Sequence, residues 1–118
     1  GKQMKDLNPE DYVHFVPSYG DNRELPEEEQ CSIELCPMDG GEFRAYTRSV
    51  NSKKNNLEKV VERIVRDRVK SISNYEDIRG KPIEDGQALF DRGEVGFVDE
   101  VFTALTEISV LKEGRRKK

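Results

Sequence analysis

The segment EVGFVDEVFTALTEISVLK, residues 94–112, is the feature that most constrains how this chain can fold. Its apolar side chains recur at spacings of three and four, which predicts one long amphipathic helix. The apolar face covers roughly half of the helix circumference, wider than the stripe of an ordinary surface helix. Its centre is formed by Val98, Val101, Phe102, Leu105 and Ile108, and its sides by Phe97, Ala104 and Leu111.

A face this wide allows two interpretations. In the first, the helix is central and its own domain covers the whole face. In the second, one flank is left free for another subunit or a partner, because a large exposed apolar patch usually marks an interaction site. The second interpretation predicts that the partner-contact residues are Phe97, Val101, Ala104 and Leu111.

A second helix is predicted over residues 56–72. Asn55 followed by Glu58 resembles a capping box, and an apolar stripe follows at helical spacing. The opposite face is basic, and it is either a solvated surface or a site for an acidic partner or nucleic acid. The stripe consists of Leu57, Val61, Ile64, Val65, Val69 and Ile72, and the basic face of Lys59, Arg63, Arg66 and Lys70.

Shorter elements complete the fold prediction. Residues 85–93 suit a short helix with Asp85 as N-cap and Gly93 at its end. Residues 11–19 predict an early strand that Pro17 either limits to the edge of a sheet or terminates, and residues 31–38 alternate as a half-buried strand does.

Residues 41–50 carry Phe43, Tyr46 and Val50 at helical spacing, with a hairpin strand as the alternative. The resulting class is α+β, a small N-terminal antiparallel sheet with a helical C-terminal half; a mostly α fold is the alternative.

The length of 118 residues fits a single domain over residues 1–118. Within it we expect flexible residues 1–10, a solvated acidic loop at 20–30 and a basic tail at 112–118. The tail carries five basic residues and one acidic residue, so its charge of +4 leaves −8 on the rest of a chain with net charge −4. An acidic body disfavours binding to nucleic acid. The absence of a long apolar stretch argues against a membrane partner and favours a cytoplasmic protein.

The motifs of catalysis are missing from the sequence. Gly80-Lys81-Pro82 lacks the upstream glycine and the hydroxyl residue of a phosphate loop, and His14, the only histidine, is expected on a strand surface. Cys31 and Cys36 are predicted to be buried thiols on opposite faces of a strand, without a mutual disulfide. We therefore expect no metal, no cofactor and no enzymatic activity.

The loop NYEDIRGKPIEDG, residues 74–86, is instead predicted to be an architectural connector. Gly80 permits a positive φ, and Pro82 restricts the backbone beside it. Ile78 and Ile83 are expected to anchor the two ends of the loop in the core.

Residues 69–114 resemble the second half of phage tail assembly chaperones, small proteins encoded between the major tail protein and the tape-measure protein of long-tailed phages and prophages. Tyr75 stands at the family's aromatic position, Asp77 to Ile83 is similar to its Gly-Lys-Pro loop, and Val98 to Ile108 to its final helix. The stretch IELCPMDGGEFRAY, residues 33–46, is similar to its strand, turn and helix.

The resemblance implies a non-enzymatic chaperone in the bacterial cytoplasm. Its partners would be the tape-measure protein and the major tail protein, and self-association is left open. The alternative is a small regulatory protein that binds nucleic acid through Lys59, Arg63, Arg66 and Lys70; a small enzyme ranks third.

Overall fold

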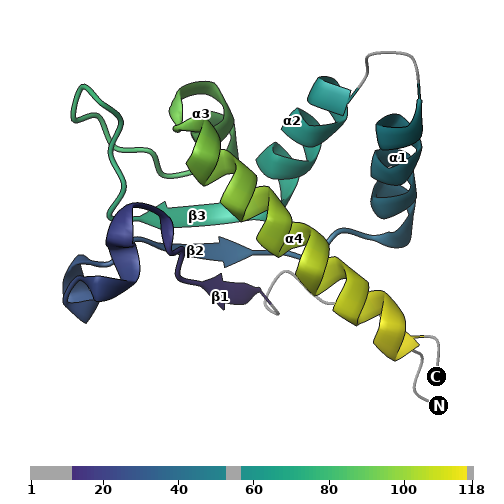
Figure 1. The fold of residues 1–118 in the computed structure, drawn as a ribbon, viewed down its shortest axis with the longest axis horizontal. Helices are drawn as coiled ribbons and strands as arrows, with labels where there is room; N and C mark the ends of the chain where they lie inside the picture. Colours follow the sequence, from purple (N-terminus) through teal and green to yellow (C-terminus); the bar gives the residue numbers. More distant parts are fainter. Residues whose placement is uncertain (1–11, 53–56, 117–118) are drawn as a thin grey trace.

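The computed structural model describes residues 12–52 and 57–116, with backbone alone for residues 111–116. It has the α+β class that the sequence predicts, with helices packed on a three-stranded sheet (Figure 1). The expected flexible residues 1–10 and the Asn55 cap lie outside the described residues. In chain order the elements are β1 (Val13–Phe15), the 3₁₀ helices η2 (Tyr19–Glu24) and η3 (Glu27–Glu29), β2 (Ser32–Leu35), α1 (Gly40–Asn51), α2 (Leu57–Arg68), β3 (Val69–Ser73), α3 (Gly86–Arg92) and α4 (Val95–Arg116).

The sheet is antiparallel with the strand order β1-β2-β3. Ile33 at its centre pairs with Phe15 on one side and Ile72 on the other. Alternation sends these side chains to the helix-covered face, and Ile33 is fully buried. On the opposite face the exposed His14 makes a 2.8 Å hydrogen bond with Glu34, so its predicted surface position is confirmed.

The helix predicted over 56–72 is wrong at its C-terminal end. α2 ends at Arg68, and Val69 begins β3, which lies outside the N-terminal half to which the sequence assigned the sheet. β3 pairs Leu35 with Val69 and Glu34 with Ser71, so Lys70 is skipped in a bulge. The bulge brings Val69 and Ile72 to the same buried face although they are three residues apart. That spacing is also the spacing of a helix, which explains the error.

The predicted helices α1, α3 and α4 are confirmed, and the hairpin alternative to α1 is wrong. Asp85 caps α3 by accepting a 2.8 Å hydrogen bond from the Ala88 N–H. α4 crosses the sheet diagonally (Figure 1), and its buried side chains, including Leu105, form the core together with Ile33 and Ile64.

The acidic segment 20–30 is largely exposed, as the predicted solvated loop implies, but it forms the short helices η2 and η3 instead of an irregular loop. Asn22 is buried in it, and its amide nitrogen donates to the carbonyl oxygens of Pro17 and Cys31 at 2.8 and 3.0 Å. Its side-chain oxygen accepts from the Cys31 N–H at 2.7 Å. The buried amide of Asn22, together with hydrogen bonds from the Gln30 and Asn74 side chains to backbone carbonyls, fixes a segment that carries no apolar period.

The connecting loop is braced as expected, with one difference. Gly80 has a φ of 81°, which is positive as predicted, and Ile83 is fully buried. Ile78 is 94% exposed, so its predicted role as a core anchor is wrong. The anchor is Asp77, whose carboxylate accepts hydrogen bonds from the Arg79 and Lys81 N–H groups and forms an ion pair with Arg92.

These contacts to the charged form hold the pKa of Asp77 below its usual value of 3.8, the Lys81 N–H contributing most. A lowered folded-state pKa stabilises the fold above pH 3.8, and this stability is lost as the pH falls through the folded-state pKa. We expect Asp77→Asn to lower the urea midpoint at pH 7, and the difference from the wild type to close at acid pH. Asp99→Asn, at an exposed carboxylate of α4, is the control. A difference between the two proteins that does not shrink at all as the pH falls below 3.8 would contradict this role of the charge.

Candidate partner-binding surface

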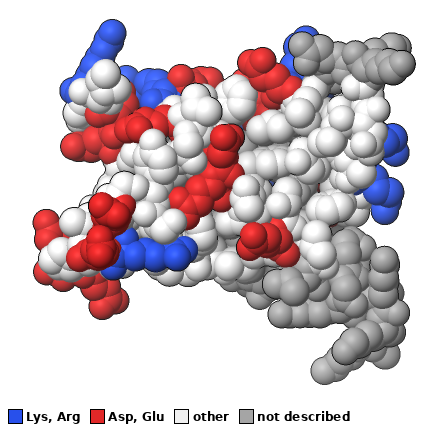
Figure 2. All heavy atoms as spheres, viewed as in Figure 1, with Lys and Arg blue, Asp and Glu red and all other residues white. Residues whose placement is uncertain are grey.

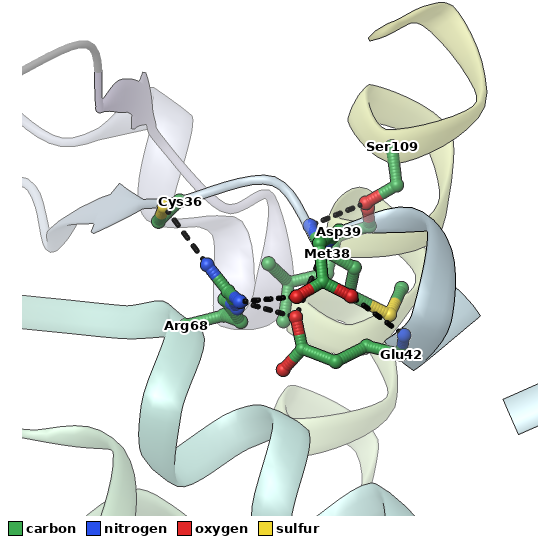
Figure 3. Close-up of polar contacts among 7 residues, drawn as sticks. Cys36, Met38, Asp39, Glu42, Arg68 and Ser109 are labelled. Carbon is green, nitrogen blue, oxygen red and sulfur yellow. Dashed lines mark hydrogen bonds and ion pairs between the residues drawn. The ribbon is translucent and has the colours of Figure 1, made fainter. Parts of the chain in front are cut away.

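The start of α1 is fixed to the rest of the domain by polar contacts (Figure 3). Asp39 caps the helix: its carboxylate accepts from the Glu42 N–H at 2.7 Å, and the Glu42 carboxylate accepts from the Asp39 N–H at 3.0 Å. The preceding Met38 is fully buried, and its N–H donates to the Ser109 hydroxyl of α4 at 2.9 Å. The hydroxyl donates in turn to the Leu105 carbonyl at 2.7 Å, so this buried polar group is fully satisfied.

Arg68, the last residue of α2, holds the same end of α1 from the other side. Its guanidinium forms a short ion pair with Glu42 and lies 3.5 Å from the Asp39 carboxylate. It also donates to the Cys36 sulfur at 3.4 Å (Figure 3), while the Arg68 carbonyl accepts from the Cys36 N–H at 2.8 Å. The side chain is only 23% exposed, so these contacts are partly shielded from water. Arg68 thus joins α1 to the point where α2 becomes β3.

Beyond this fixed end, α1 has an apolar face that is only half covered. None of its residues is fully buried. Phe43 and Tyr46 are half-buried, and Val50 is 50% exposed. Their spacing of three and four places them on one side of the helix, and the Tyr46 ring meets Phe102 of α4 edge-on at a centroid distance of 4.9 Å. We call Phe43, Tyr46, Val50 and Phe102 the α1 apolar surface.

The surroundings of the α1 apolar surface are polar on one side. Figure 2 shows a broad uncharged area between α4 and α1, with Lys or Arg side chains at its margin beside α1. α1 contributes the exposed Arg44 and Arg48. An apolar strip with basic neighbours suits a helix that carries an apolar stripe and acidic flanks.

Three of the four partner-contact residues predicted on α4 lie in the core and not on the protein surface. Phe97, Val101 and Ala104 are 2%, 0% and 9% exposed, so the structure contradicts a free flank formed by these side chains. The Phe97 ring lies between Tyr19, at a centroid distance of 5.7 Å, and Tyr75, at 4.4 Å. The first interpretation of α4, a helix covered by its own domain, holds for these three residues; the Leu111 side chain lies outside the described part.

Ser18 and Tyr19, at the start of η2, provide the cover over Phe97. The Glu100 carboxylate of α4 accepts from the Ser18 and Tyr19 N–H groups at 2.7 and 2.9 Å. A β-carbon at Gly96 would lie 2.8 Å from the Tyr19 ring, so the glycine permits the close approach. The periodicity of α4 alone could not show that a segment distant in the sequence covers it. The periodicity of residues 41–50 did show that Phe43, Tyr46 and Val50 lie on one side of α1.

The predicted basic face is divided between two elements. Lys59, Arg63 and Arg66 are exposed on α2, with Arg66 paired to the adjacent Asp67 at 3.1 Å. Lys70 is exposed on β3. The four cations therefore do not form one helix face.

The two thiols are free and occupy different environments. Cys31 is buried, and burial raises its pKa to about 11. Cys36 is only half-buried, which corrects the prediction of two buried thiols. Within the described part of the chain, no group of three or more His, Cys, Asp or Glu side chains could hold a metal ion.

Comparisons with known proteins do not assign this chain to a family. Searches with protein-family models, curated proteins and solved structures found no match to this chain. None of the helices in the described ranges combines the length and apolar character needed to cross a membrane.

Arg68→Ala should destabilise the fold by about 2 kcal/mol, below the cost of breaking a fully buried pair because Arg68 is partly exposed. Urea unfolding measures this change. Arg66→Ala, at an exposed arginine of the same helix, is the matched control and should change stability by less than about 0.5 kcal/mol. Equal effects of the two substitutions would contradict the role assigned to Arg68.

Thiol labelling separates the two cysteines. At pH 8 a thiol with a pKa of about 11 is roughly one part in a thousand thiolate, and only the thiolate attacks. Ellman's reagent should therefore titrate one thiol, Cys36, in the native protein and two in denaturant. Cys36→Ser should remove the native reaction, and rapid reaction of both native thiols would contradict the burial of Cys31.

Proposed function

We propose that this chain is a tail assembly chaperone of a long-tailed phage or prophage, which binds the tape-measure protein without catalysis. The observation that carries the proposal is the α1 apolar surface. An amphipathic helix held at one end, with no residue fully buried, presents apolar area that water covers in the free protein. The order of elements in residues 33–46 and 69–114 supports the same assignment through its resemblance to that family.

The partner surface would be an apolar stripe on a tape-measure helix, bound alongside α1. Phe43, Tyr46 and Phe102 already pack partly against the core, and covering what remains exposed of the four side chains contributes roughly 3–5 kcal/mol. This is no more than the lower end of the cost of association, about 4–15 kcal/mol. One contact would therefore be weak, and stable coating requires several chaperone copies along one long partner. Such binding is readily reversed, as a chaperone that leaves the finished tail requires.

The second partner in this proposal is the major tail protein, which the chaperone brings to the tape-measure protein in the cytoplasm of the bacterial host. The acidic charge of residues 1–111 keeps such a complex soluble while apolar surface is exposed. Lys59, Arg63 and Arg66 on α2 carry the alternative of nucleic-acid binding, which the division of the basic face makes weaker.

A pull-down tests the proposal with this chain as bait and the tape-measure and major tail proteins encoded beside it as prey. We expect capture of the tape-measure protein in both low and high salt, because apolar contacts do not depend on counterion release. Val50→Asp should weaken capture by roughly tenfold or more, since it places a charge in the interface. Val95→Asp is the matched control, because Val95 is an exposed valine at the start of α4, away from α1.

Three outcomes would contradict the proposal. The first is a folded wild-type bait that captures neither protein. The second is an equal effect of the two valine substitutions. The third is binding to DNA or RNA that disappears in high salt and with Lys59→Glu, which would favour the nucleic-acid alternative.

A further inference from the structure

The loop that joins β3 to α3 ends in an exposed tip, Ile78 to Lys81. Ile78 is 94% exposed, more than any other large apolar side chain among the described residues. The exposed Arg79 and Lys81 flank it, and no ion pair involves either side chain in the described part of the chain. In Figure 1 the loop projects from the body, and basic side chains stand at that end in Figure 2.

The tip is held in this shape by the loop itself. The Asp77 N–H donates to the Lys81 carbonyl and the Gly80 N–H to the Asp77 carbonyl, both at 2.9 Å. Arg92 of α3 binds the Asp77 carboxylate and donates to the Pro82 carbonyl at 3.1 Å. A preformed tip loses little conformational entropy when it binds.

A groove of complementary charge lies at the base of the same loop. Its volume is about 680 Å³, and the buried Ile72 and the half-buried Tyr75 are among the residues that line it. Four carboxylates line it, and none has an ion pair within the described residues: Glu28, Glu29, Glu76 and Glu84.

We propose that two copies of this chain associate by reciprocal insertion, with Ile78, Arg79 and Lys81 of each copy in the acidic groove of the other. Ile78 would contact Ile72 and Tyr75, and the two cations would meet the unpaired carboxylates. The hydrogen bonds of the turn hold the tip away from its own groove, and Ile78 is 94% exposed.

The position of both parts favours a second copy over a different partner. The tip and much of the groove belong to the same loop, and η3 and the end of β3 complete the groove beside it, so a two-fold axis beside this loop brings each tip to the other groove at once. The contact is therefore made twice in a closed pair. The α1 apolar surface belongs to other elements, so this association is independent of the proposed function.

Sedimentation equilibrium of the full chain between roughly 10 µM and 1 mM tests the proposal. We expect the mass to rise with concentration from 13.6 kDa toward twice that value. Ile78→Asp should weaken association by more than roughly a hundredfold, because the lost contact occurs twice. Val95→Asp, at an exposed valine outside the loop, should leave the association unchanged.

Charge exchange provides the decisive experiment. One variant carries Arg79→Glu and Lys81→Glu in the tip, and the other replaces all four groove carboxylates, Glu28, Glu29, Glu76 and Glu84, with Lys; each should abolish self-association. An equimolar mixture should restore a dimer. In the mixed pair, the acidic tip of the first variant meets the basic groove of the second. The unchanged basic tip of the second variant meets the unchanged acidic groove of the first, so both contacts are attractive. Circular dichroism and the urea midpoint check that both variants are folded.

Each other outcome overturns the proposal. A wild-type protein that stays monomeric at the highest concentration excludes the association. A dimer that survives Ile78→Asp uses another surface. Two folded charge variants that remain monomeric when mixed show that the tip or the groove has a different occupant, such as an acidic or a basic protein.

Discussion

Covering the wide apolar face of α4 is the constraint on which the rest of this structure depends. Phe97, Val101 and Leu105 together need more cover than a three-stranded sheet provides. The sheet and α2 cover the centre of the face, and Tyr19 and Tyr75 enclose Phe97. The segment that brings in Tyr19 is tied to Glu100 of α4 itself, so the longest helix also positions its own cover.

Arg68 stabilises a second feature of the fold, the direct change from helix α2 to strand β3 without a loop between them. α2 ends and β3 begins at consecutive residues, and the chain direction must be fixed at that point. The Arg68 carbonyl accepts from the N–H of Cys36, just beyond β2, while its side chain reaches Asp39 and Glu42. One residue therefore coordinates the sheet and the first turn of α1, and a shift at the junction would be felt by both.

The parts of the fold that could be predicted from the sequence are those determined by residues close together in the chain. Periodicity located α1 and α4, the cap residues Asp85 and Gly93 located α3, and the positive φ of Gly80 followed from the residue type. The failures have physical causes. The bulge at Lys70 makes a strand look helical, the order of residues 20–30 depends on the buried amide of Asn22, and the cover of Phe97 comes from a segment distant in sequence. A pattern within one helix shows which side is apolar, but the identity of its cover is a property of the whole fold.

The unequal attachment of α1 has a consequence for how the domain opens. Its first turn is held by an ion-pair cluster and a buried hydroxyl, while the remainder of the helix has no fully buried residue. Regions with little buried apolar area separate from a protein at the lowest free energy, and they do so as cooperative units. The first excursion from the native state is therefore a fraying of α1 from its C-terminal end, which unmasks the inner sides of Tyr46 and Val50 while the first turn and the α4 core stay in place. The domain can thus widen its apolar area reversibly, without global unfolding.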